Sequence, residues 1–220
     1  VESYMALKLA GIPADRPEML RAHEAICANG GIKNTRVFTK IFLAMFGQIP
    51  WEVCPAIPVE IILFGNWFPF NIYEMSSWSR GTVVPLSIIV SHKPVHHLPE
   101  GRDVKELFTS SDHELGFEPD GSMFSSWKNF FIYLDRIIKF VGKSPWKPFR
   151  KVALEKAYQW VVDHQEDQGD FAGIQPAMLN SLLAYHYEGV SKDDPKWIKG
   201  WESVERFLIE KKEGTLMQAC

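Results

Sequence analysis

Apolar residues recur at helical spacing through most of the chain, and glycine or proline follows each run. The pattern predicts helices over 2–9, 18–28 and 35–46, each closed by a glycine within two residues of its end. Thr35 is a candidate N-cap of the third helix. Three short helices in succession favour stacked helical hairpins.

The second half of the chain shows the same periodicity. It predicts helices over 124–141, 149–164, 178–187 and 197–211. The apolar run Val59–Phe64 fits either a strand or a buried helix, because it is too short for periodicity to decide.

Residues 156–176 combine a helix, a turn and a loop. Val161 contributes to a buried helix face, and Gly169 is expected to close the helix in the left-handed cap conformation. Phe171 then serves as an aromatic plug, and 173–176 form a stiff exit loop. A simpler interpretation is an ordinary capped amphipathic helix.

Composition narrows the function classes. The net charge is −3 and 23% of residues are charged, which gives no indication of a nucleic-acid partner. Aromatic residues make up 13% of the chain, including eight Trp, which suits a large core or an apolar or carbocationic ligand. A chain of 220 residues fits one domain, or one domain and part of another.

Metal and disulfide chemistry are not expected. Cys27, Cys54 and Cys220 are far apart in the sequence, which argues against a zinc site or a disulfide framework and fits a reducing compartment. Asp193-Asp194 precedes a proline and is typical of a turn and helix cap. Four histidines fall in the polar stretch 91–121, which we expect to be a connection over the surface with exposed imidazoles: His92, His96, His97 and His113.

No run reaches the ~18 consecutive apolar residues of a spanning helix. No signal peptide is visible, and the chain starts within a helical pattern, so we expect a segment of a longer protein.

The stretch 124–141 has an apolar stripe that covers about half the helix circumference. Lys128, Asp135, Arg136 and Lys139 occupy the opposite side. One interpretation is a core helix. The other is an interfacial helix whose aromatic face enters lipid while its basic residues meet anionic head groups.

Three sequence blocks carry a family resemblance. Lys-Ala-x-x-Trp-Val-x-x-x-Gln starts at Lys156 and is followed by Gly-x-Phe and by the Ala-Gly-Ile-Gln-Pro loop at 172–176. The other two blocks are Asn71–Arg80 and Arg36–Lys40. Together they resemble the triterpene cyclases, with a QW repeat at the first block, and in particular the squalene–hopene cyclases. The resemblance extends over essentially the whole chain.

The resemblance implies an all-α fold, an α/α barrel of helical hairpins. Residues 1–214 would form the inserted barrel domain, with a membrane-associated helix near 123–141, and 215–220 would begin the connection to the catalytic domain. The β-branched run 82–90 favours a strand by propensity. The resemblance implies a helix with Pro85 inside it, which we prefer because no convincing partner strand is present.

The implied reaction is cyclisation of squalene to hopene or hopanol by protonation of a terminal alkene and a carbocation cascade. It needs a strong acid and a dry aromatic cavity, and no metal, nucleotide or redox cofactor. The family's acid lies in an Asp-x-Asp-Asp motif, which this sequence does not contain. The segment would therefore supply cavity wall and membrane contact, and would be inactive alone.

The resemblance also assigns residues. The substrate-cavity positions are Trp78, Ile174, Gln175, Pro176, Phe38 and Arg36. Trp78 and Phe38 could equally be ordinary core aromatics, and Gln175 could cap a turn. The membrane-contact positions are Phe124, Trp127, Phe130, Phe131, Leu134, Ile137 and Ile138.

The implied partners are squalene and a lipid membrane surface, with a homodimer as the assembly of the full-length enzyme. The implied location is peripheral (monotopic), on the cytoplasmic side of a bacterial membrane. Oxidosqualene remains an alternative substrate. Two other functions stay open: a non-catalytic helical membrane-binding module, and a prenyltransferase-like α/α barrel, which would need a zinc site from Asp, Cys and His.

Overall fold

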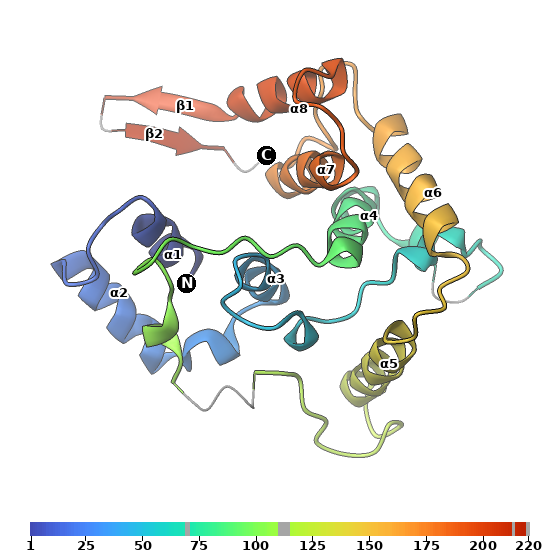
Figure 1. The fold of residues 1–220 in the computed structure, drawn as a ribbon, viewed down its shortest axis with the longest axis horizontal. Coiled ribbons are helices and arrows are strands. Elements are labelled where there is room, and N and C mark those ends of the chain that lie inside the picture. Colours follow the sequence, from blue (N-terminus) through green and yellow to red (C-terminus); the bar gives the residue numbers. More distant parts are fainter. Residues whose placement is uncertain (69–70, 110–114, 213, 219–220) are drawn as a thin grey trace. The chain divides into compact units, whose positions relative to one another are not determined.

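The computed structural model describes residues 1–68, 71–109, 115–212 and 214–218 (Figure 1). Within them the chain forms eight α-helices, several 3₁₀ turns and one two-stranded hairpin, which confirms the predicted all-α class. The chain divides into two compact units. The first comprises Val1–Ala56 and Lys93–Lys143, and the second comprises Ile57–His92 and Ser144–Cys220.

The first unit contains four α-helices: α1 (Glu2–Leu9), α2 (Pro17–Ala28), α3 (Val37–Met45) and α5 (Trp127–Gly142). Its 3₁₀ turns are Gly31–Asn34, Trp51–Val53 and Lys105–Leu107. The core is apolar and draws on α1, α2 and α3 and on the connections between them; its members include Tyr4, Met19, Ile32, Ile41, Leu43 and Ile49.

Two sequence predictions fail in this unit. Thr35 is not the N-cap of α3: its hydroxyl donates to the Ile32 carbonyl at 2.7 Å and closes the preceding 3₁₀ turn, and Arg36 takes the cap position. The stretch 91–121 does not lie wholly on the surface. Val104, Leu107 and Leu115 are buried because the connection packs its few apolar side chains into the core of this unit.

The second unit contains α4 (Ser77–His92), α6 (Arg150–Asp163), α7 (Gln175–Tyr187) and α8 (Pro195–Glu205). Its 3₁₀ turns are Val59–Leu63 and Ile72–Glu74. In Figure 1, α4 lies next to α7, and α4 also packs on α6. Of the two alternatives for the apolar run, a strand or a buried helix, the structure has a short 3₁₀ helix whose Val59 and Ile62 are buried.

Helix α4 forms despite its β-branched residues. Val84, Ile88 and Ile89 are buried together with five other residues of the stretch 81–89, so packing outweighs intrinsic strand propensity. Pro85 lies inside the helix, as the resemblance implied.

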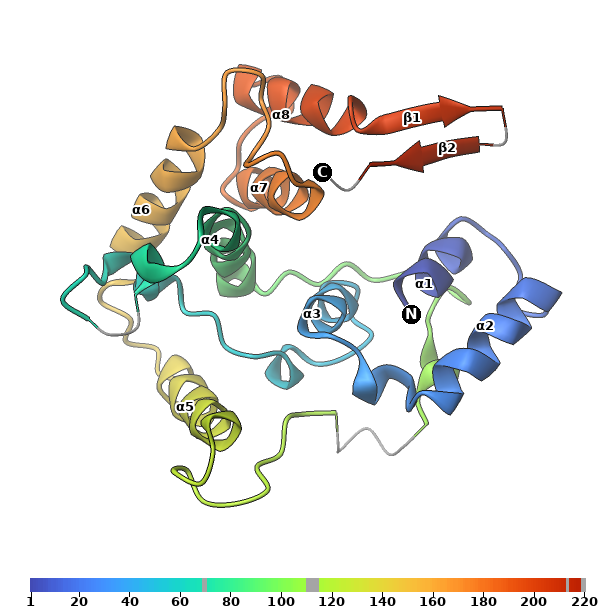
Figure 2. The ribbon, with the colours of Figure 1, turned by 180° about the vertical axis from the view of Figure 1, so that it is seen from behind.

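The last predicted helix is only half correct. Helix α8 ends at Glu205, and Leu208–Lys211 forms strand β1, which pairs antiparallel with β2 (Gly214–Met217). The hairpin leads away from the end of α8 (Figure 2). Leu208 pairs with Met217 and Ile209 with Leu216, so the backbone of this segment forms its hydrogen bonds between two strands instead of along a helix. Gln218 continues the pairing by donating its N–H to the Phe207 carbonyl at 2.8 Å.

Candidate functional site

The second unit brings two of the predicted blocks together where α4 and α7 begin. A Cβ on Gly81 would lie 3.6 Å from the Ala172 Cβ and 3.7 Å from the Ala177 Cβ, so the two segments approach to within about one methyl group. Deeper in the interface, the buried Asn180 donates from Nδ2 to the Thr82 carbonyl at 3.4 Å. The start of α4 is therefore held against the segment that contains the predicted loop.

Trp78 lies in the first turn of α4 and is 64% exposed. Ile174, Gln175 and Pro176, the other predicted cavity residues of this unit, do not form the expected exit loop. Ile174 is the N-cap of α7, and Gln175 and Pro176 form its first turn, because proline is well suited to a first helical turn. Ile174 and Gln175 are half-buried and Pro176 is exposed.

The backbone before Ile174 is left-handed at two successive residues. Ala172 has φ 57° and Gly173 has φ 62°. Glycine adopts this conformation freely, whereas alanine pays a steric cost for it. The left-handed backbone of Ala172, in the turn just before Ile174 and Gln175, is therefore maintained by the packing around it.

A cavity of about 90 Å³ lies beside this junction. Trp160 and His164, on α6 and at its end, stack with ring centroids 3.7 Å apart and form part of its wall. The other lining residues are Ser77, Gly81, Glu166, Phe171 and Ala172. Trp78 does not line it, because the helical step turns Trp78 away from the face shared by Ser77 and Gly81.

Gln165 connects three elements of this unit. Its Nε2 donates to the Gly169 carbonyl at 3.1 Å and to the Lys196 carbonyl at 2.9 Å, and its Oε1 accepts from the Tyr185 hydroxyl at 3.2 Å. Burial raises the pKa of Tyr185, so this hydroxyl stays protonated and donates. The sequence placed Gln165 at a helix end and as the glutamine of the QW-repeat block, but did not predict these hydrogen bonds.

Gly169 has a positive φ of 91°, as predicted, but for another reason. Helix α6 ends at Asp163 with His164 as its C-cap, so Gly169 is not its cap residue. A Cβ on Gly169 would lie 2.2 Å from the Lys199 carbonyl oxygen, so glycine allows close approach of this turn to α8. Phe171 is buried in the core of the unit, as the plug prediction required.

Arg36 and Phe38 belong to the first compact unit, at the start of α3, and both are exposed. Near them, Lys40 is only 2% exposed. Its ammonium donates to the Leu115 carbonyl at 2.8 Å and lies 4.5 Å from the centre of the Phe117 ring. Burial lowers the pKa of Lys40. A lysine inside the apolar run of α3 was the available sequence signal, and the sequence interpretation missed it.

Helix α5 exposes much of its apolar face. Trp127 is 72% and Phe140 78% exposed, and Phe131 and Ile137 are also exposed. Phe124 precedes the helix, which begins at Trp127 with Ser126 as N-cap. Phe130, Leu134 and Ile138 are half-buried.

The charges of α5 are paired locally. Lys128 bonds Asp120 at 2.8 Å, Arg136 bonds Glu118 at 2.6 Å and Lys139 bonds Asp135 at 2.7 Å. The stretch 115–142 carries three basic and three acidic residues, so it has no net charge. These basic groups are therefore matched by acids of the same segment.

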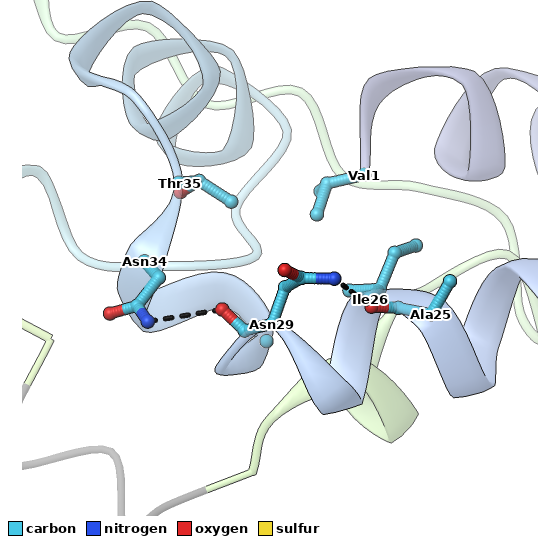
Figure 3. A pocket seen from close by; sticks show the side chains of 7 residues that line it. Val1, Ala25, Ile26, Asn29, Asn34 and Thr35 are labelled. Atoms are coloured by element: carbon cyan, nitrogen blue, oxygen red, sulfur yellow. Dashed lines mark hydrogen bonds between the residues drawn. The ribbon is translucent and has the colours of Figure 1, made fainter.

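A larger cavity, about 310 Å³, lies in the first unit. Figure 3 shows its wall, where Asn29 Nδ2 donates to the Ala25 carbonyl at 2.7 Å and Asn34 Nδ2 to the Asn29 carbonyl at 3.0 Å. Val1, Ile26, Gly31 and Thr35 complete the lining. None of the predicted site residues lines it, and its polar groups serve the turn after α2.

Across the described ranges, no group of three His, Cys, Asp or Glu side chains could hold a metal ion. Cys27 and Cys54 are free thiols there, and Cys220 lies outside the described residues. His92, His96 and His97 are exposed, and His113 also lies outside the described part.

Asp194 caps α8 through the Lys196 N–H at 2.8 Å, which confirms the turn-and-cap prediction. None of the helices in the described part is long and apolar enough to cross a membrane.

Comparison with known proteins identifies one family. The sequence model of the squalene–hopene cyclase N-terminal domain matches residues 1–213. A squalene–hopene cyclase of Alicyclobacillus acidocaldarius is 38% identical over 96% of this chain and 32% of its own length. The squalene hopane cyclase afumA of Aspergillus fumigatus is 37% identical, over 100% of this chain and 30% of its own.

A plant protein, the dammaradiene synthase of Dryopteris crassirhizoma, is 33% identical over 100% of this chain and 32% of its own length. The chain thus spans about a third of the length of these relatives, which come from a bacterium, a fungus and a fern.

Proposed function

The chain belongs to the squalene–hopene cyclase N-terminal domain family, and we propose that the protein containing it cyclises squalene by protonation and a carbocation cascade. The observation that carries this proposal is the family match over 1–213. It is supported by the close approach of Gly81, three residues after Trp78, to Ala172, two residues before Ile174. The products would be hopene and hopanol.

In this proposal the chain supplies part of the wall of the substrate cavity. Trp78 in the second unit and Phe38 in the first are large aromatics that this chain leaves exposed. Such residues acquire a role when the remaining two thirds of the protein covers them. An aromatic face in a dry cavity stabilises a carbocation through its quadrupole. Ile174 and Gln175 would border this cavity in the second unit. Phe38 and Arg36 of the first unit are proposed as cavity residues from the family resemblance.

The proton donor would lie outside this chain. Protonating an isolated alkene needs a strong carboxylic acid, and the Asp-x-Asp-Asp pattern does not occur in the sequence. We therefore propose that these residues alone have no cyclase activity. No cofactor is required by this chemistry.

Membrane contact is the second part of the proposal. Squalene is an apolar hydrocarbon and partitions into lipid, so its enzyme must take it from a membrane. The exposed aromatic face of α5, with Trp127, Phe131 and Phe140, suits insertion to the depth of the head-group boundary. A peripheral position on the cytoplasmic side follows from this proposal, and so does a homodimer if the full-length enzyme follows its family.

The test is squalene turnover by the full-length protein, followed by gas chromatography of the products. Trp78→Leu should lower turnover about 30-fold, the equivalent of ~2 kcal/mol for a desolvated cation–π contact, and Trp78→Phe should recover part of it. Trp201→Leu is the matched control, since Trp201 is exposed on α8 and contacts Glu205 at 2.9 Å. Full activity of Trp78→Leu would refute the cavity assignment.

A non-catalytic membrane-binding module is the second candidate, favoured only by the exposed face of α5. It predicts vesicle binding by the full-length protein with no conversion of squalene or oxidosqualene. Comparing these two substrates in the same assay also decides which one the enzyme accepts.

A further inference from the structure

The segment that follows α5 is strongly basic and aromatic. Between 143 and 152 the sequence has four basic residues, Lys143, Lys147, Arg150 and Lys151, and no acid. Trp146 and Phe149 lie between them and are exposed, Trp146 to 79%. An exposed Trp beside lysine is unusual on a water-facing surface and is typical of the interface between water and lipid.

A second aromatic group lies in the same compact unit. Residues 61–73 contain no charged residue. Within this stretch Trp67 is 77% exposed and packs edge-on against Phe64 and Phe68, with ring centroids 6.3 and 5.6 Å away. The three rings form one cluster.

An ion pair joins the two segments that carry these aromatic groups. Arg150, at the start of α6, binds Glu60 of the turn Val59–Leu63 at 2.7 Å. Trp146 lies four residues before Arg150, and Trp67 lies four residues after Leu63, so both segments lead away from this contact. Figure 1 shows both chain segments at the same end of α6.

The segment 143–152 differs from α5 in how its basic groups are paired. The basic groups of α5 are matched by Asp120, Glu118 and Asp135. Lys147 has no acidic partner within the described residues, and Lys151 reaches Glu155 only at 3.8 Å with both side chains largely exposed. Exposed pairs of that length contribute little. The net positive potential therefore lies beside Trp146 and not on α5.

We propose that Lys147, Lys151, Trp146 and Trp67 form a second lipid-binding surface, which recognises anionic head groups, whereas α5 contacts lipid without preference for head-group charge. This inference rests on the proposed membrane function. A lipid surface fits better than a soluble anion because the two exposed indoles need an apolar environment that a free phosphate does not provide.

The test is co-sedimentation of the full-length protein with phosphatidylcholine vesicles, with and without about 30 mol % phosphatidylglycerol. The wild type should bind the anionic vesicles more tightly. Lys147→Glu/Lys151→Glu should weaken this binding at least about 30-fold and leave binding to neutral vesicles unchanged. Trp67→Ser/Trp146→Ser should weaken binding to both vesicle types about tenfold.

Matched controls are Lys192→Glu/Lys199→Glu, two exposed lysines of the same unit, and Trp201→Ser. Circular dichroism checks that each variant is folded. The proposal is overturned if Lys147→Glu/Lys151→Glu binds anionic vesicles as the lysine control does, or loses equal affinity for neutral ones. Phe131→Ser/Phe140→Ser tests α5 separately, and unchanged binding of this variant to neutral vesicles would refute the α5 contact. In that case, loss of the preference for anionic vesicles in Lys147→Glu/Lys151→Glu would still support the second surface.

Discussion

Gly81 of α4 faces Ala172 so closely that a methyl group on Gly81 would lie 3.6 Å from the Ala172 Cβ. That distance is ordinary van der Waals contact, so the gap between the two segments is about one methyl group wide. It fixes how deeply the start of α4, with Trp78, lies against the turn before α7. The position of the candidate site thus depends on the absence of a large side chain at Gly81.

Gly81→Ala should stabilise the protein by about 0.5–1 kcal/mol, because alanine favours the helix and the new methyl finds an ordinary contact distance. Gly81→Leu should destabilise it by about 1–3 kcal/mol by forcing the turn away from α4. Urea unfolding measures both. Equal destabilisation by Ala and Leu would show that the two segments are closer than the structure has them.

Ala172→Gly should raise the free energy of unfolding by about 1 kcal/mol. The left-handed backbone at Ala172, with φ 57°, costs an L residue about 1–2 kcal/mol, and glycine returns part of that through its greater freedom in the unfolded chain. Ala177→Gly, at a buried helical position of the same contact, should instead destabilise. Thermal unfolding compares the pair, and a loss of stability in Ala172→Gly would contradict the strain argument.

Gln165→Leu should cost about 2–4 kcal/mol. It removes the amide that serves the Gly169 and Lys196 carbonyls and leaves the buried Tyr185 hydroxyl without its acceptor. Gln159→Leu is the control, since Gln159 is exposed and its amide donates to the exposed Asp163 carboxylate; it should change stability by less than about 0.5 kcal/mol. Similar values for both variants would show that Gln165 does not connect these elements.

Helix periodicity predicted most of the fold because most helices here bury one face. Periodicity failed in segments where buried and exposed positions do not alternate along the chain. In α4 every residue from Gly81 to Ile89 except Val83 is buried, so its β-branched residues alone pointed to a strand, and only the family resemblance favoured a helix. The hairpin after α8 failed for the opposite reason. Leu208 and Ile209 are both exposed, so neither helix nor strand period marks a core face.

The candidate site was less predictable than the fold. Motif resemblance named Trp78 and Gln175, but the turn that presents Gln175 depends on the left-handed Ala172, which no periodicity signals. The buried ammonium of Lys40 depends on Leu115, far away in the sequence. Helix α5 itself carries three basic residues and one acid; the acids that pair with Lys128 and Arg136 precede the helix, so its own pattern does not reveal them.

Alkaline pH should weaken the fold through Cys54. This thiol is almost fully buried, and burial raises its pKa from 9.0 to about 11. In the unfolded chain the thiol ionises near pH 9, whereas in the folded protein it stays protonated until about pH 11. The stability that this group contributes is therefore fully present below pH 9 and is lost as the pH rises from 9 to 11, by about 1–3 kcal/mol in all.

Unfolding free energies of the wild type and Cys54→Ala, measured in urea at intervals from pH 7.5 to pH 11, isolate this effect, because Tyr4 and the other titrating groups are common to both proteins. Cys54→Ala loses buried volume and should be less stable at neutral pH, and it has no thiol to titrate at this position. The difference between the two proteins should therefore shrink above pH 9. A difference that stays constant to pH 11 would mean that the Cys54 thiol ionises at the same pH in the folded and the unfolded state, and hence that it is not shielded from water as the structure places it.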